Sequence, residues 1–363
     1  MGRLSGLFNS IQSWLFPALE EELGELGEKE REFVKLIELV KPEEFLEPFM
    51  WHGVGRPPKS RLSLFKAMEL QSVFNYPNRE AMIDGLRGSP KLRRLCGWET
   101  LGEIPSEATF SRAFAEFAEA ELPSKLHEAM VKRNAGELLV GHVSRDSTAI
   151  AAREKAVSKE PQPKAAPKKR GRPKKGEARP PQELKRLDMQ LKRGLEENLA
   201  DLPKDCAWGC KKGSKGKVES WRGYKLHIDT MDGGTPLSVV LTSASTHDSQ
   251  VAIPLAQMTA QRVTSLYDLM DSAYDAPQIK EFSFKLEHVP VIDSNKRRGQ
   301  KIEFDPAKKE RYKIRSTAER VNSELKDNYG GKSIRVRGYA KVLAHLMFGI
   351  IAITAKQLFN LLC

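Results

Sequence analysis

The spacing of the apolar residues changes near residue 137, and this change limits the possible folds more than any other feature of the 363-residue chain. Earlier segments carry apolar side chains at helical spacing, as Phe110 and Phe114 do. The segment 137–152 instead alternates as a half-buried strand does. We therefore predict an all-helical N-terminal domain over residues 1–135, followed by an α/β region.

The remainder of the chain shows strand and helix signals in alternation. Segments 221–230 and 235–245 flank Asp232-Gly233-Gly234, which is a strong hairpin signal. Two further strands are predicted at 264–270 and 288–293, and one helix at 251–260. This order favours a mixed sheet with helices on its faces.

The most apolar segment, 343–363, is interrupted by His345 and Lys356. The uninterrupted apolar stretch is too short to cross a bilayer, so we predict a buried packing helix and no membrane partner. Cys206 and Cys210 form a pair that, with His227, could hold zinc, but no second such pair follows. The scattered cysteines favour a reducing cytoplasm.

A basic segment interrupts the α/β region after its first strand. Between residues 153 and 175 the chain carries ten Lys or Arg against two Glu, a balance of +8 within a net charge of +12. Interspersed prolines exclude a packed core, so we predict a flexible arm followed by one amphipathic helix at 181–199, the whole insertion covering 153–217. The excess of positive charge favours a nucleic-acid partner.

Two short features could contact DNA directly. Arg170-Gly171-Arg172-Pro173 resembles the core of an AT-hook, which lies in a narrow minor groove, although we favour general phosphate binding by the arm. Helices around the segment 99–106 could form a helix-turn-helix variant that exposes Ser111 and Arg112. A helical bundle used for packing or dimerisation explains the same pattern.

One helical stretch combines acidic, basic and phenolic side chains. Tyr312, Arg315, Glu319 and Lys326 are spaced by 3, 4 and 7 residues, which returns each side chain to nearly the same helix face. Such a stripe is usually a solvated face. Together with Asp146 and Asp271 at strand ends, it could instead serve phosphodiester chemistry, in which carboxylates hold divalent ions.

The same residues match a known pattern. The spacing Y-x2-R-x3-E-x6-K from Tyr312 to Lys326 resembles the signature of the DDE transposases of bacterial insertion sequences. Asp271-Ser-Ala-Tyr274-Asp275 is similar to the block around the second catalytic aspartate of that family, and Arg145-Asp146-Ser147-Thr148 to the block around the first. The segment 241–250 is similar to the stretch after the hairpin.

This resemblance implies an RNase H-like catalytic domain built from residues 136–152 and 218–363. It implies two Mg²⁺ or Mn²⁺ ions per active site, held by Asp146 on the first strand, Asp271 after the fourth and Glu319 on a late helix. Tyr312, Arg315 and Lys326 would grip phosphates at the transposon end. Asp248 is a candidate auxiliary residue, with helix N-capping as its alternative role.

The function implied is that of a bacterial, nucleoid-associated cytoplasmic DNA transposase. It would bind the terminal inverted repeats of its element through the N-terminal domain, cut them and join them to target DNA, as a homodimer on the double-stranded DNA. An RNase H-like nuclease without strand transfer, or an inactive transposase-derived DNA-binding protein, are the alternatives. The segment 294–309 replaces the large β-rich insertion of some relatives, so a hairpin intermediate is not implied.

Overall fold

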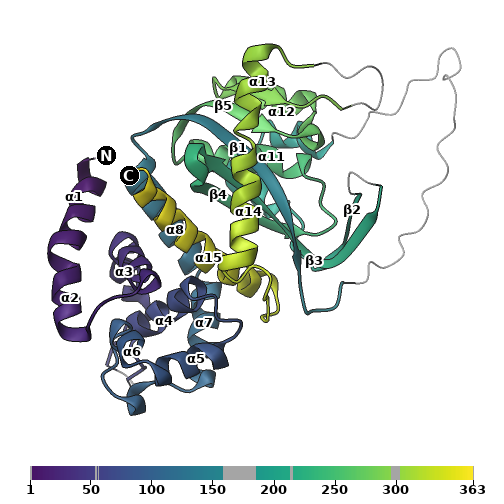
Figure 1. Ribbon diagram of the computed structural model, residues 1–363. Helices are drawn as coiled ribbons and strands as arrows, with labels where there is room; N and C mark the ends of the chain where they lie inside the picture. Colours follow the sequence, from purple (N-terminus) through teal and green to yellow (C-terminus); the bar gives the residue numbers. More distant parts are fainter. Residues whose placement is uncertain are drawn as a thin grey trace, which may run out of the picture.

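The computed structural model describes residues 2–53, 55, 57–157, 185–212, 216–295 and 303–362 (Figure 1). It shows an α/β fold in which a mixed sheet is flanked by helices and preceded by a helical region. The helical region comprises α1 (Gly2–Ser10), a π-helical turn (Ile11–Leu15), α2 (Phe16–Leu23), α3 (Glu28–Val40), α4 (Arg61–Val73), α5 (Arg79–Gly88), α6 (Pro90–Leu95), α7 (Glu107–Glu119) and α8 (Leu122–Ala135). The predicted fold class is confirmed.

The final helix, α15 (Tyr339–Asn360), packs among these N-terminal helices rather than standing apart. It contacts α3, α4, α7 and α8, and Phe348 packs against the rings of both Phe65 and Phe114. By length and composition α15 could cross a membrane, but 78% of its most apolar window is buried inside the protein. The predicted packing helix is confirmed, and the helical region completes its core with α15.

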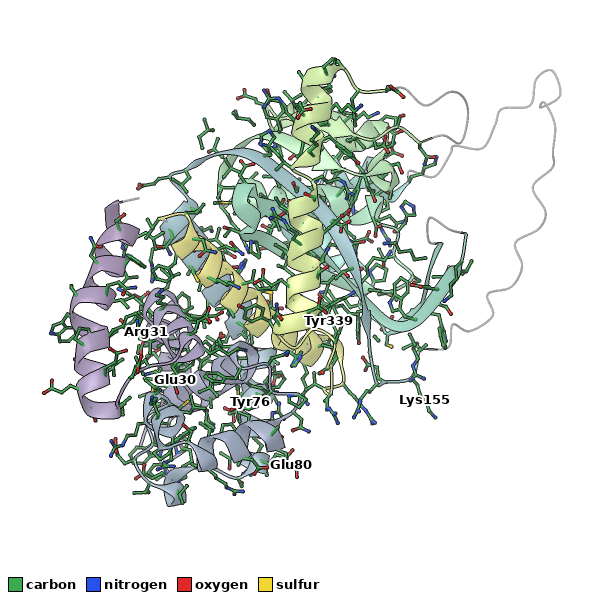
Figure 2. All side chains as sticks on the ribbon, viewed as in Figure 1. Glu30, Arg31, Tyr76, Glu80, Lys155 and Tyr339 are labelled. Carbon is green, nitrogen blue, oxygen red and sulfur yellow. The ribbon has the colours of Figure 1, made fainter. Side chains whose placement is uncertain are left out.

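Tyr339, at the start of α15, connects this helical layer to the sheet (Figure 2). Its hydroxyl donates a hydrogen bond to the carbonyl oxygen of Leu241, and its ring meets the edge of Tyr224. The two layers are therefore joined by specific polar and aromatic contacts as well as by a shared apolar core.

The sheet contains six strands: β1 (Leu139–Ala151), β2 (Ala207–Lys212), β3 (Val218–Met231), β4 (Pro236–Ser243), β5 (Thr264–Met270) and β6 (Val289–Ile292). Strands β2, β3, β1, β5 and β6 lie side by side in that order, and β4 also pairs with β3. Pairs β1–β3, β2–β3 and β3–β4 are antiparallel, whereas β1–β5 and β5–β6 are parallel. The hairpin predicted between β3 and β4 is confirmed, and Gly233 and Gly234 adopt the positive φ angles that its turn requires.

Six helices accompany the sheet: α9 (Arg186–Gln190), α10 (Leu195–Ala200), α11 (Ser249–Ala260), α12 (Pro277–Lys285), α13 (Pro306–Lys313) and α14 (Ser316–Asn328). Helix α11 packs on β3 and β4, and α14 crosses β1 and β3 in front of the sheet (Figure 1). Thr259 of α11 donates a hydrogen bond to Asp229, which also bonds Arg145 of β1. On the other side, Ser144 of β1 donates a hydrogen bond to the carbonyl of Ile314, just before α14. Because the neighbouring residues Ser144 and Arg145 point to opposite faces of the sheet, α11 and α14 cover opposite faces.

Three expectations about local structure are wrong. The single helix predicted at 181–199 is two short helices, because Gly194 takes an extended conformation and begins α10. Strand β2 was not predicted, so Asp271 follows the fifth strand rather than the fourth. The helix predicted to run through Tyr312 and Lys326 is interrupted at Ile314–Arg315, where α13 ends and α14 begins. Arg170 and Arg172 lie outside the described residues.

Candidate active site

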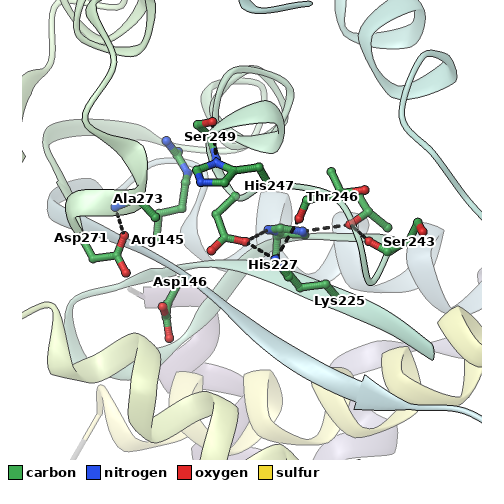
Figure 3. A network of polar contacts seen from close by, with 12 residues as sticks. Arg145, Asp146, Lys225, His227, Ser243, Thr246, His247, Ser249, Asp271 and Ala273 are labelled. Atoms are coloured by element: carbon green, nitrogen blue, oxygen red, sulfur yellow. Dashed lines mark hydrogen bonds and ion pairs between the residues drawn. The ribbon is translucent and has the colours of Figure 1, made fainter. Parts of the chain in front are cut away.

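The two predicted aspartates meet where β1 and β5 run side by side. These strands are parallel, and their register pairs Ser144 with Leu269. Asp146 and Asp271 each lie two residues further along, so the register places them next to each other at one end of the strand pair (Figure 3). The carboxylate of Asp271 accepts a 2.8 Å hydrogen bond from the backbone N–H of Ala273, which fixes its orientation.

Asp146 lies against α14. Its Oδ2 accepts a 2.9 Å hydrogen bond from Nδ2 of Asn322, and its Oδ1 is 3.9 Å from a guanidinium nitrogen of Arg315. Burial raises the pKa of Asp146 to about 6, the negative charges of Asp271 and Glu319 act in the same direction, and Arg315 opposes them. Burial also raises the pKa of Asp271. Both carboxylates are therefore harder to ionise than an exposed aspartate, and a further cation nearby would favour their ionised forms.

The four residues of the polar stripe do not share one helix. Tyr312 is on α13, where burial raises its pKa to about 12. Arg315 lies at the junction and forms an ion pair with Glu319, whose side chain is 54% exposed. Lys326 is further along α14 and is half-buried. Arg315 thus interacts with both Asp146 and Glu319, and in the described residues Glu319 forms no three-carboxylate group with the two aspartates.

Within the described ranges, no group of three or more His, Cys, Asp or Glu side chains lies close enough to hold a metal ion. The suggested zinc ligands do not converge. Cys206 is buried and its thiol lies 3.8 Å from the carbonyl oxygen of Glu154, Cys210 is exposed on β2, and His227 bonds Thr242. The zinc reading is therefore wrong for this structure.

Asp248 belongs to the polar network that includes Lys225 and His227, which Figure 3 shows near Asp146 and Asp271. It occupies the N-cap position of α11, but its side chain accepts no capping hydrogen bond, so the capping role is wrong. Its carboxylate instead accepts a 2.9 Å bond from Nζ of Lys225. Although burial acts in the opposite direction, the pKa of Asp248 is lowered. Because burial lowers the pKa of His227 to about 3, Lys225 is the neighbouring cation at neutral pH.

A buried ion pair supports β1 directly beside Asp146. Arg145 makes two 2.7 Å hydrogen bonds to Asp229 of β3, and both side chains are almost completely buried. Thr259 of α11 donates a third bond, also 2.7 Å, to Asp229. This bonding ties β1, β3 and α11 together on the face opposite α14, and so fixes the backbone that carries Asp146.

Sequence reasoning missed two of these supporting residues. Asn322 is three positions after Glu319, so its place on the same helix face was available from spacing alone. Arg145 gave no such signal, because a charged residue in a strand is normally exposed and its partner lies 84 positions away. In the helical region, Arg112 is exposed, whereas Ser111 is half-buried and accepts a 2.7 Å bond from Arg79.

Comparison with known protein families identifies two matching segments. The family described as transposase DDE domain matches residues 146–355, which is more than half of the chain. A second family, described as transposase domain (DUF772), matches residues 19–116. No curated protein and no solved structure matches.

Proposed function

Because the chain belongs to the DDE-type transposases of insertion elements, we propose that it binds the ends of its element, cleaves them and transfers the freed strand to target DNA. The juxtaposition of Asp146 and Asp271 by the parallel β1–β5 register is the observation that supports this chemistry most directly. Helix α14 brings Glu319 to the same side of the sheet, one turn away from Arg315.

Two of the three proposed ligands suit a divalent metal ion, whereas Glu319 pairs with Arg315 and does not join them in the described residues. Asp146 and Asp271 offer hard oxygen ligands, and burial together with neighbouring negative charge disfavours their ionised forms in the absence of a cation. We propose that they hold Mg²⁺ or Mn²⁺, two ions per site, with Glu319 as the third ligand after it leaves Arg315. Bound in this way, the ions would activate the attacking oxygen and stabilise the leaving oxygen.

The side chains around the carboxylates fit a phosphate backbone. Arg315 lies between Asp146 and Glu319, and a DNA phosphate could replace Glu319 as its partner. Tyr312 and Lys326 lie on either side of Arg315 along α13 and α14. We propose that these three residues grip the transposon end and that Asn322 keeps Asp146 oriented.

The remaining assignments concern partners. We propose that the helical N-terminal region recognises the terminal inverted repeats, and that Arg170 and Arg172 of the basic insertion add affinity for duplex DNA. Concerted transfer requires two ends, which favours a homodimer on DNA. The expected setting is the bacterial cytoplasm, in association with the nucleoid.

A strand-transfer assay tests the function. The purified protein is incubated with Mn²⁺ and a duplex carrying the terminal repeat of its element, and nicking and joining are followed on gels. Nicked ends that join target DNA support a transposase. Ends that are nicked but never joined would identify a nuclease, and uncut ends would contradict both.

The substitution Glu319→Gln should abolish cleavage, because it removes a metal ligand, while binding of the duplex stays within about twofold of the unmodified protein. Glu310→Gln is the matched control: Glu310 is an exposed glutamate on α13 that pairs only with Lys313 among the described residues. Equal activity of the two variants would remove Glu319 from the catalytic set.

A further inference from the structure

A pocket of about 320 Å³ lies where the helical region meets the segment that leads from α14 to α15. Its walls come from helices α5 and α7, from the chain just after β1 and from residues 333–336. Hydrogen bonds hold these parts together. The backbone N–H of Gly338 donates a 2.9 Å bond to the carboxylate of Glu154, and the backbone N–H of Gly330 donates a 3.1 Å bond to the side chain of Asn75. The pocket is therefore formed by three parts of the chain that contact one another.

One arginine from each of these parts lines the pocket: Arg79, Arg153 and Arg335. Arg79 is fixed in orientation, because its guanidinium donates a 2.7 Å hydrogen bond to Ser111 and lies 4.6 Å from the centre of the Phe114 ring. Arg153 and Arg335 are exposed, and neither forms an ion pair or a side-chain hydrogen bond among the residues that the structure describes. A guanidinium carries a planar fork of N–H donors that matches the oxygens of a phosphate. The pocket thus presents two unpaired forks beside a third that is already held in place.

Two glutamates also line the pocket, and their positions in helices account for both. Glu80 and Glu107 lie in the first turns of α5 and α7, where a negative side chain stabilises the helix. Burial lowers the pKa of His345, the other ionisable side chain of the lining, so this group is neutral at neutral pH. Three arginines against two glutamates leave the lining positive. An anion is therefore the ligand whose charge suits the pocket.

The place of the pocket in the chain favours DNA as the source of this anion. Arg153 begins the basic insertion, in which ten Lys or Arg stand against two Glu over residues 153–175, and Arg112 is exposed on α7. Roughly 17 Å of β1 separates Asp146 from Ala151 at the end of the strand. At about 3.4 Å per base pair, a phosphate in the pocket would lie roughly five base pairs from the one at the aspartates. One short duplex can therefore reach both places.

We propose that this pocket binds one backbone phosphate of duplex DNA through Arg153, Arg335 and the fixed Arg79. The helical region and the chain that carries the candidate catalytic residues then hold the same phosphate, which sets both regions on one duplex. This inference rests on the proposed function, because it takes the anion to be DNA.

The test compares Arg335→Ala with Lys285→Ala in the full-length protein. Lys285 is an exposed lysine on α12, which lies at the opposite end of Figure 1 from α5. Affinity for a duplex that carries the element's terminal repeat is measured across salt concentrations. Arg335→Ala should weaken binding about tenfold at low salt and reduce the slope of log K against log salt by about 0.9. Lys285→Ala should change neither, and equal behaviour of the two variants would overturn the proposal.

Glu80→Gln tests the sign of the ligand's charge. Removing a negative charge from the lining should tighten binding about twofold, because the glutamate repels a phosphate. Glu281→Gln is the matched control, since Glu281 is an exposed glutamate on α12. Weaker binding by Glu80→Gln, or the same change in both variants, would contradict an anionic ligand in the pocket.

A third measurement locates the phosphate. Single neutral methylphosphonates are placed in turn along both strands of the duplex. One of them, at least about three base pairs from the cleavage position, should weaken binding of the unmodified protein as much as Arg335→Ala does. It should cause no further loss in Arg335→Ala. Additive losses at every position would refute the contact.

The proposed function and the pocket contact fail differently. If the unmodified protein cuts and joins the duplex but Arg335→Ala and Lys285→Ala bind alike, the pocket contact is refuted and the proposed function stands. If the unmodified protein binds the duplex through Arg335 but neither cuts nor joins it, the proposed function is refuted and the contact stands. A protein that binds no duplex would refute both.

Discussion

Asp146→Asn should stabilise the metal-free protein while abolishing its cleavage activity. The folded protein raises the pKa of Asp146 to about 6, whereas an aspartate in an unfolded chain titrates near 3.9. The folded state therefore binds the proton more tightly than the unfolded state does. Ionisation of Asp146 therefore lowers the free energy of unfolding progressively as the pH rises from about 4 to about 6. Above pH 6 the full loss of stability remains.

The magnitude follows from the shift. A difference of about two pKa units corresponds to roughly 3 kcal/mol near pH 8, and about half of that near pH 5. Asparagine removes this cost because it carries no charge, and its amide is the same size as the carboxyl group. At about 2.1 cal/mol/K per residue, 3 kcal/mol raises the melting temperature by about 4 °C for a chain of this length.

Differential scanning calorimetry without metal, near pH 8 and near pH 5, measures the effect. Asp248→Asn is the matched control, and its effect on stability should be the opposite. The pKa of Asp248 is lowered and its carboxylate bonds Lys225, so this variant should be less stable than the unmodified protein near pH 8. Adding Mg²⁺ should stabilise the unmodified protein more than Asp146→Asn, since the variant has lost a metal ligand. The reasoning fails if Asp146→Asn melts no higher than the unmodified protein near pH 8, or if its advantage is as large near pH 5.

Two further predictions concern the supports of Asp146. Asn322→Ala should lower kcat of end cleavage about tenfold, because Asp146 loses the donor that orients it, while DNA affinity is unchanged; unchanged cleavage would show that the bond is dispensable. Arg145→Met leaves Asp229 charged and unpaired in the interior, so urea denaturation should show a loss of about 3–5 kcal/mol. A loss below about 1 kcal/mol would mean that water or rearrangement replaces the guanidinium.

The sequence predicts the parts of this fold that depend on local patterns. The alternation of β1, the Asp-Gly-Gly turn before β4 and the short apolar strand β5 are all visible in single segments, and they carry Asp146 and Asp271 to their places. Strand β2 was missed because Ala207–Lys212 contains a glycine and two lysines, and only pairing with β3 makes it a strand. This segment becomes a strand only because it pairs with β3, and the spacing of its residues cannot show that pairing.

The candidate site likewise has features that the sequence predicts and features that it does not. Residue spacing places Glu319 and Asn322 on one helix face, but it cannot show that Glu319 forms no three-carboxylate group with the aspartates in the described part of the chain. Asp248 precedes α11 as a capping residue would, yet its carboxylate bonds Lys225 of β3 instead. In the second case a contact between distant elements outweighs the local preference of a residue that precedes a helix.

The position of α15 affects how the protein folds during synthesis. The helices of residues 2–135 leave the ribosome first, but the apolar surface around Phe65, Phe114 and His127 is covered only when α15 arrives. About 200 residues separate α8 from α15, so at translation rates of roughly 5–20 residues per second this surface stays uncovered for about 10–40 s. A fragment that ends before α15 would lack the central helix of its own bundle, and the N-terminal helices should acquire their final packing only after the sheet has been made.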